Sequence, residues 1–217
     1  MNRRPAVPAP AEPTPVVFVV DDDEELRLAL DNLFRSVGLQ ARLFGSAAEF
    51  LKVGPGDAPG CLVLDIRLPG VSGLEFQAQL ARTGIELPIV FMTGHGDVPM
   101  SVRAMKAGAV DFLTKPFRDQ DMLDAVSSAI EADRQRRAAA EAGRDVRARF
   151  ENLSPREREV MTLVTRGLMN KQVAGELGLS EITVKLYRAQ AMRKMSADTL
   201  ADLVRMAEHL ALHASRG

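Results

Sequence analysis

Short apolar runs alternate with longer amphipathic stretches through the first 130 residues of the chain. Each run has the length of a buried strand, and each following stretch has the apolar spacing of a helix. The runs that predict strands lie at 16–20, 40–44, 61–65, 89–93 and 110–114. The stretches that predict helices lie at 24–37, 47–53, 73–83, 98–107 and 120–130.

These five β/α units predict the architecture of the first domain. Strands that are apolar along their whole length are typical of a parallel sheet with helices on both faces. We therefore expect a doubly wound α/β domain with a five-stranded parallel sheet over residues 16–130. Residues 1–15 hold five prolines and predict a disordered or extended arm, to which we assign no function.

The pattern changes after residue 130. Residues 131–150 are rich in alanine, arginine and glutamate, with few large apolar side chains, and predict an exposed helical linker. Its arginines suit a solvated face better than a DNA contact. Residues 151–217 predict a second, smaller all-α domain, with helices at 155–166, 170–177, 181–195 and 198–211. Ser154, with Glu157 three residues later, resembles a capping box at the first of these.

Charge is distributed unevenly along the 217 residues, although the formal net charge is only −1. Residues 1–125 hold 12 basic and 17 acidic residues, a net of −5, whereas residues 126–217 hold 16 and 12, a net of +4. The acidic half favours a cation and the basic half a polyanion such as DNA. The single cysteine, Cys61, lies in an apolar run and predicts a buried, unpaired side chain. With no membrane-spanning stretch or signal peptide, we expect a soluble, cytoplasmic protein that contacts no membrane.

Polar residues follow the predicted strands of the first domain at the point where each strand ends. Asp21 and Asp22 follow the first strand, Asp65 and Thr93 end the third and fourth, and Lys115 follows the fifth. The carboxyl ends of parallel strands border the crevice in which such sheets place their sites. Three clustered carboxylates require a hard divalent cation, so we expect Mg²⁺ or Mn²⁺ there.

A simpler interpretation assigns the acidic run after the first strand to the dipole of the following helix. It accounts well for Asp23, Glu24 and Glu25. It leaves Asp65 and Lys115 unexplained, since both lie on other strands.

The second domain contains a helix-turn-helix pattern, in which a helix at 170–177 and a short turn precede the helix at 181–195. Ser180 predicts the N-cap of the longer helix. At 100° per residue, one side of that helix is an apolar stripe of Val184, Ala191 and Met195. The opposite side holds the residues expected to face base edges, namely Lys185, Leu186, Ala189 and Arg193.

Chemistry assigns these positions different contacts with DNA. Lys185 suits guanine, whereas Leu186 and Ala189 suit thymine methyl groups. Thr183, Tyr187 and Arg188 flank this face and are expected to reach phosphates. The alternative, from this helix alone, is an amphipathic core helix with a solvated basic face.

Four segments of the first domain resemble the signature segments of bacterial response-regulator receiver domains, which have a flavodoxin-like fold. They are Val19-Val20-Asp21-Asp22, Leu64-Asp65-Ile66-Arg67-Leu68-Pro69-Gly70, Met92-Thr93-Gly94-His95-Gly96-Asp97 and Lys115-Pro116-Phe117. The run from Thr93 to Phe117 is especially similar to the FixJ subgroup.

This resemblance implies that Asp65 accepts a phosphoryl group from a cognate sensor histidine kinase. It further implies that the metal is held by Asp22, Asp65 and the Arg67 carbonyl, with Asp21 acting through water. Thr93 and Lys115 would contact phosphoryl oxygens, and Phe112 would rotate toward the space that Thr93 leaves. The family also has a cis peptide at the position of Lys115-Pro116.

Three segments of the second domain resemble the LuxR-type DNA-binding domain: Leu153 to Val160, Gly167 to Lys171, and Thr183 to Lys185. The combination resembles FixJ/NarL-type regulators, which implies homodimerisation on phosphorylation, DNA and RNA polymerase as partners, and Lys171 as a further DNA contact. Two positions depart from the pattern. Tyr187 stands where histidine is frequent, and Gly175 lies inside a helix, where it costs about 1 kcal/mol against alanine.

Two other functions fit parts of the sequence. A Mg²⁺-dependent phosphohydrolase would also form an aspartyl phosphate, but its nucleophile follows the first strand and a cap domain holds the substrate. A phosphorylation-dependent adaptor would bind protein, and not DNA, through its helical domain. The central position of Asp65 and the C-terminal helices favour the regulator.

Overall fold

Five parallel strands form the central sheet of the first of two structural units. The structure is a computed structural model that describes residues 13–94 and 98–212, and the chain divides between Arg137 and Ala138. The predicted arm up to residue 12 and the motif residues 95–97 lie outside the described residues.

The sheet has the strand order β2-β1-β3-β6-β7, and every neighbouring pair is parallel. In register, Val16 of β1 pairs with Gln40 of β2 on one side and Gly60 of β3 on the other. The strands are β1 (Val16–Val20), β2 (Gln40–Phe44), β3 (Gly60–Asp65), β6 (Ile89–Thr93) and β7 (Asp111–Thr114). This topology confirms the predicted doubly wound sheet, with strand bounds within one residue of those expected.

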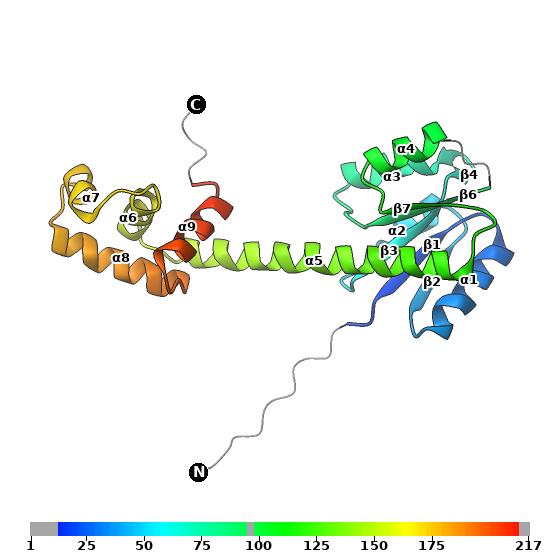
Figure 1. Cartoon of the computed structure of the whole chain (residues 1–217), viewed down its shortest axis with the longest axis horizontal. Coiled ribbons are helices and arrows are strands. Elements are labelled where there is room, and N and C mark those ends of the chain that lie inside the picture. The colour runs from blue at the N-terminus through cyan, green and yellow to red at the C-terminus, as the bar shows by residue number, and fades with distance from the viewer. Residues whose placement is uncertain (1–12, 95–97, 213–217) are drawn as a thin grey trace, which may run out of the picture. The chain divides into compact units, whose positions relative to one another are not determined.

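Side chains of each central strand alternate between two apolar layers, because successive residues of a strand point to opposite faces. Phe18 of β1 belongs to the layer under three helices, α2 (Ala47–Val53), α3 (Gly73–Arg82) and α4 (Val98–Lys106). Val17 and Val19 belong to the opposite layer, under α1 (Glu24–Ser36) and α5 (Asp119–Glu151). Figure 1 shows the sheet of this unit between its helices.

Two elements differ from the sequence predictions. The helix expected at 120–130 and the linker expected at 131–150 form one helix, α5. Apolar periodicity stops at Ile130, but the alanine, arginine and glutamate residues that follow are good helix formers, and no proline interrupts them. The sequence analysis also missed the antiparallel pair β4 (Arg67–Leu68) and β5 (Val71–Ser72). These two-residue strands are too short to show a period.

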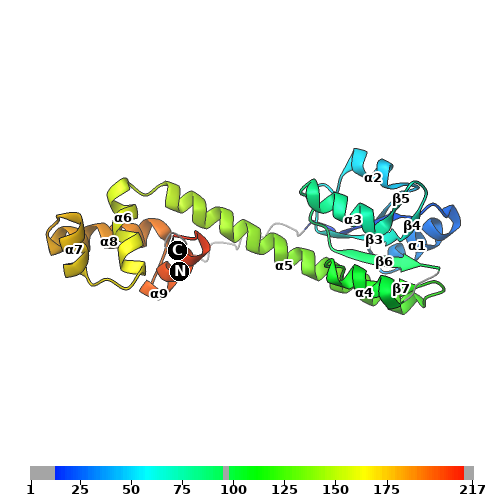
Figure 2. The ribbon, with the colours of Figure 1, turned by 90° about the horizontal axis from the view of Figure 1, so that it is seen from above.

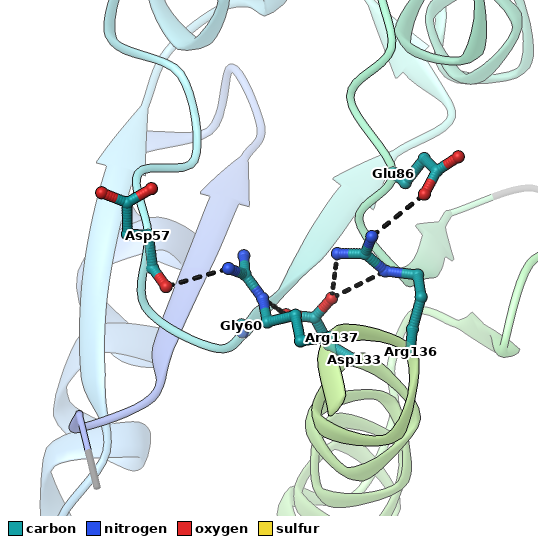
Figure 3. Close-up of polar contacts among 6 residues, drawn as sticks. All are labelled: Asp57, Gly60, Glu86, Asp133, Arg136 and Arg137. Atoms are coloured by element: carbon teal, nitrogen blue, oxygen red, sulfur yellow. Dashed lines mark hydrogen bonds and ion pairs between the residues drawn. The ribbon is translucent and has the colours of Figure 1, made fainter. Parts of the chain in front are cut away.

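Asp133 is fully buried, although it lies in the segment predicted to be exposed. Its carboxylate accepts hydrogen bonds from the Gly60 backbone N–H at 3.0 Å and from Arg137 Nε at 2.6 Å. Arg136 donates two more, from Nη2 at 2.7 Å and Nε at 3.1 Å. Figure 3 shows the two guanidinium groups on either side of this carboxylate. The polar end of the α5 segment within the first unit is therefore fixed to the start of β3.

The same two arginines extend the cluster to neighbouring loops. Arg136 Nη1 pairs with Glu86 Oε2 at 3.0 Å, and Arg137 Nη1 donates to the Asp57 carbonyl at 2.9 Å. Figure 3 shows both contacts. These are exposed contacts, so their free energies are small beside that of the buried carboxylate.

Four helices form the second unit together with the last turns of α5, and Figure 2 shows them in one group. They are α6 (Pro155–Thr165), α7 (Asn170–Leu177), α8 (Glu181–Met195) and α9 (Leu200–His209). The capping box predicted for Ser154 and Glu157 is present. α9 starts two residues later than expected because Thr199 and Asp202 form a second capping box. None of the described helices is long and apolar enough to cross a membrane.

Candidate functional site

Three carboxylates meet at the carboxyl ends of β1 and β3. Asp21 and Asp22 follow β1, and Asp65 is the last residue of β3, which is paired with β1. One carboxylate oxygen from each lies within 4.8 Å of those of the other two. Asp21 and Asp65 are buried, whereas Asp22 is exposed. The sequence prediction that these three side chains meet is confirmed.

Lys115 brings a positive charge into this cluster from the end of β7. Its ammonium group donates to Asp21 Oδ2 at 2.6 Å and to Asp65 Oδ2 at 3.0 Å. Burial disfavours the charged form of Lys115, but the two carboxylates outweigh it, so the pKa of Lys115 is raised. Burial also raises the pKa of Asp21, and the hydrogen bond from Lys115 only partly offsets this effect.

Backbone geometry orients the two buried carboxylates. The Asp23 N–H donates to Asp21 Oδ1 at 2.9 Å, and the Arg67 N–H donates to Asp65 Oδ1 at 3.1 Å. Each carboxylate therefore has one oxygen held by the loop after its strand and the other held by Lys115. The contact found for Arg67 is through its N–H, so the metal contact of its carbonyl stays a prediction.

Two further predicted residues of this site lie on β6 and β7, the two strands that follow β3 in the sheet. Thr93 is fully buried at the end of β6, and its carbonyl accepts a hydrogen bond from the Lys115 N–H at 2.7 Å. Phe112 is half-buried on β7 and packs against the layer under α2, α3 and α4. The Lys115-Pro116 peptide is cis, as the resemblance implied.

The donor set fits a hard divalent cation. Mg²⁺ binds oxygen at about 2.0–2.1 Å, so two of its ligands lie about 4.2 Å apart at most. The three carboxylate oxygens, within 4.8 Å of one another, reach that spacing with small side-chain shifts. A single ammonium offsets one of three negative charges, so a cation is also favoured electrostatically.

Gly73 is a site residue that the sequence analysis missed. It is the first residue of α3, and its N–H donates to the Ile66 carbonyl at 2.8 Å. A Cβ atom on Gly73 would lie 2.5 Å from the Asp65 carbonyl oxygen, closer than packed atoms approach. Only glycine lets α3 begin directly beside the backbone of Asp65. The glycine is visible in the sequence, but the close approach is not.

The long helix α8 has the two faces predicted for it. Val184, Ala191 and Met195 are fully buried in the core of the second unit. The opposite residues are all exposed, namely Lys185, Leu186, Ala189 and Arg193. Ile182 shares this exposed face, and the sequence analysis missed it. The same helical wheel places it there, about 160° from Val184.

The turn between α7 and α8 is closed by local hydrogen bonds. Gly178 ends α7 in the left-handed conformation, and the Ser180 hydroxyl accepts from the Thr183 N–H at 3.2 Å. Arg188, half-buried, donates to Asn170 at 3.3 Å and so connects the two helices. Tyr187 is half-buried against the core, and Lys171 is exposed on α7.

Both units match known protein families. Residues 17–127 match the response regulator receiver domain, and residues 151–207 match the luxR family of bacterial regulatory proteins. Nodulation protein W of Bradyrhizobium diazoefficiens is 60% identical over 200 residues, covering 92% of this chain and 88% of that protein. The transcriptional regulatory protein FixJ of the same organism is 44% identical over 191 residues, covering 88% and 93%.

A solved structure of the response regulator StyR gives the same result. It is 49% identical, has a TM-score of 0.78, and the match covers 90% of this chain and 98% of that one. The acidic cluster lies within the residues that match the receiver domain, and the helix-turn-helix lies within those that match the luxR family. The chain therefore belongs to the FixJ/NarL-type two-component response regulators, which regulate transcription through a receiver domain and a LuxR-type DNA-binding domain.

Proposed function

We propose that Asp65 is the phosphoryl acceptor of this regulator and that its phosphorylation by a sensor histidine kinase promotes dimerisation and sequence-specific DNA binding by α8. The observation that carries the first part is the position of Asp65. Its carboxylate ends the central strand β3, beside two further carboxylates and within 3.0 Å of the Lys115 ammonium.

In the transfer step, an Asp65 carboxylate oxygen attacks the phosphorus of a phosphohistidine. The new P–O bond forms as the P–N bond breaks, and the imidazole leaves with the bonding electron pair and takes up a proton. Asp22, Asp65 and the Arg67 carbonyl would hold Mg²⁺ or Mn²⁺, with Asp21 acting through water, and the bound cation would supply positive charge against the phosphoryl oxygens.

Two side chains of the cluster would respond to the new charge. The phosphoryl group adds about −1.5 to −2 charges, which the Lys115 ammonium is placed to balance. Thr93 is buried at the adjacent strand end, so its hydroxyl would reach the phosphoryl oxygens after a short movement. Phe112, half-buried on the neighbouring strand, would take up the space released and change the surface around α4 and β7.

Dimerisation follows from the small footprint of one helix-turn-helix unit. A single recognition helix contacts few base pairs, so two copies on a repeated site give much higher affinity. RNA polymerase is the expected partner at the bound promoter.

The receiver chemistry is tested with acetyl phosphate as donor. The full chain is incubated with acetyl phosphate and Mg²⁺, and its intact mass is measured. We expect one added phosphoryl group on the wild type, none on Asp65→Asn, and full labelling of Asp31→Asn, whose half-buried carboxylate pairs with Arg35 outside the cluster. Labelling of Asp65→Asn to the wild-type extent would contradict the assignment.

The DNA-binding half is tested separately by footprinting on genomic fragments with the phosphorylated chain. We expect Lys185→Ala to lose discrimination between sites, since its exposed ammonium faces base edges. Arg188→Ala should weaken all DNA about equally, because a phosphate contact carries no sequence information. The reverse pattern would reject this assignment of faces.

A further inference from the structure

Two large apolar side chains lie exposed on the face of α8 that points away from the core of the second unit. Ile182 is 80% exposed and Leu186, one turn later, is 55% exposed. Single exposed apolar residues are ordinary on protein surfaces. Here, however, two stand on one helical face, with Lys185 beside them and Arg193 about two turns further along the same face.

The charges around this pair indicate which partner covers it. A lipid or protein surface would suit a wider apolar patch, whereas α8 offers a narrow apolar strip with one cation beside it and a second further along the same face. Double-stranded DNA has the complementary arrangement, with two phosphate backbones bordering a groove in which the thymine methyl group is the apolar feature.

Ile182 also has the right place along the helix. Recognition helices present their N-terminal residues to base edges, and Ile182 is the second residue of α8. The Ser180 cap holds this turn by two contacts, from the Thr183 N–H at 3.2 Å and between the two hydroxyl oxygens at 2.8 Å. Isoleucine is β-branched and stiff at its first side-chain torsion, so little rotamer freedom is lost on binding.

We propose that Ile182 is a specificity-determining residue that recognises the methyl group of a thymine in the major groove. The inference rests on the proposed binding of DNA by α8 and adds a base contact to it. Leu186 provides the second apolar contact, one helical turn further along the groove. Together they make the protein select DNA by the presence of methyl groups, in addition to the hydrogen bonds of Lys185.

The test removes one methyl group at a time from the DNA. A duplex is selected from a random-sequence pool with the full chain, phosphorylated with acetyl phosphate. Each thymine is then replaced singly by deoxyuridine, which lacks only the C5 methyl group, and affinities are measured by fluorescence anisotropy. For the wild type we expect a loss of about four-fold at the contacted thymine, the value of one buried methyl-sized group.

The assignment to Ile182 comes from combining protein and DNA changes. At the thymine that Ile182 contacts, replacement by deoxyuridine should not change the affinity of Ile182→Ala. At every other thymine, the replacement should lower the affinity of this variant as much as it lowers that of the wild type. Because Ile182 is exposed, this variant should fold as the wild type does, which circular dichroism verifies. Leu200→Ala, which trims another exposed apolar residue on α9, should retain the full wild-type pattern.

Two results would overturn the inference, and they are distinguishable. If the chain selects a sequence but Ile182→Ala keeps wild-type sensitivity at every thymine, the base contact is wrong while DNA binding stands. If the phosphorylated chain enriches no sequence from the pool, the proposed function itself fails and the contact with it.

Discussion

The buried carboxylate of Asp133 accepts a hydrogen bond from the backbone N–H of Gly60, 73 residues earlier in the chain, at 3.0 Å. This bond connects α5 to the first residue of β3, at the end of the strand opposite Asp65. Two arginines complete the coordination of the carboxylate.

Replacing Asp133 by alanine should destabilise the first unit by about 1–3 kcal/mol, because the Gly60 N–H and two guanidinium groups lose their acceptor. Urea unfolding followed by circular dichroism measures the change, and hydrogen exchange at the Gly60 amide localises it. Glu131→Gln is the matched control, since this exposed acid on the same helix lies 3.9 Å from Arg134 and contributes little. Unchanged exchange at Gly60 in Asp133→Ala would argue against the contact.

Gly73→Ala should displace the backbone of Asp65, because the new Cβ meets the Asp65 carbonyl oxygen at 2.5 Å. We expect a loss of about 1–3 kcal/mol in stability and phosphorylation by acetyl phosphate slowed by about tenfold or more. Gly175→Ala is the control, since nothing lies within 4 Å of the added atom on α7. That variant should be more stable by about 0.5–1 kcal/mol and phosphorylated at the wild-type rate. If Gly73→Ala, Gly175→Ala and the wild type were phosphorylated at equal rates, α3 would accommodate the added Cβ atom without displacing Asp65.

Lys115→Met should bind Mg²⁺ more tightly than the wild type, by about tenfold or more, because the ammonium no longer competes with the cation for Asp21 and Asp65. The rise of the unfolding temperature during a Mg²⁺ titration measures this affinity. Lys106→Met removes an exposed lysine from α4 and should leave the titration unchanged. Weaker Mg²⁺ binding by Lys115→Met would contradict the electrostatic account of the site.

The second unit should lose stability in acid through Glu157. Burial disfavours its charge, but hydrogen bonds from Lys194 Nζ at 2.7 Å and from Ser154 outweigh this and hold the pKa of Glu157 below its usual 4.5. A lowered folded-state pKa adds stability that is complete above pH 4.5 and is lost as the pH falls through the folded-state value.

Glu157→Gln should therefore be less stable by about 1–3 kcal/mol at neutral pH and approach the wild type below pH 4.5. Tyr187 is the only tyrosine in a chain without tryptophan, so its fluorescence during urea unfolding reports on this unit alone. Glu159→Gln, an exposed neighbour paired with Arg156, should behave as the wild type. If the difference in unfolding free energy between Glu157→Gln and the wild type did not change with pH, the charge of Glu157 would make no contribution to stability.

The sequence alone determined the β/α order, the doubly wound parallel sheet and the residues of the acidic cluster. It did so because buried parallel strands are apolar along their length, so the polar residues Asp21, Asp65 and Thr93 mark the strand ends. Strand ends of a doubly wound sheet meet by topology, so side chains distant in sequence are brought together without any knowledge of packing. The two faces of α8 were predictable for a similar reason, because helical periodicity places the adjacent residues Val184 and Lys185 on different faces of the helix.

Only the tertiary structure decided features that depend on close approach between distant segments. Asp133 has the sequence context of a solvated helix, and its burial follows from the start of β3 packing against α5. The requirement for glycine at position 73 arises from the Asp65 backbone. The two hydrogen bonds of Lys115 arise because its strand, β7, lies in the same sheet as β1 and β3, with two strands between β7 and β1. Such contacts leave no period in the sequence, because periodicity records which face of an element is buried and not which atoms cover it.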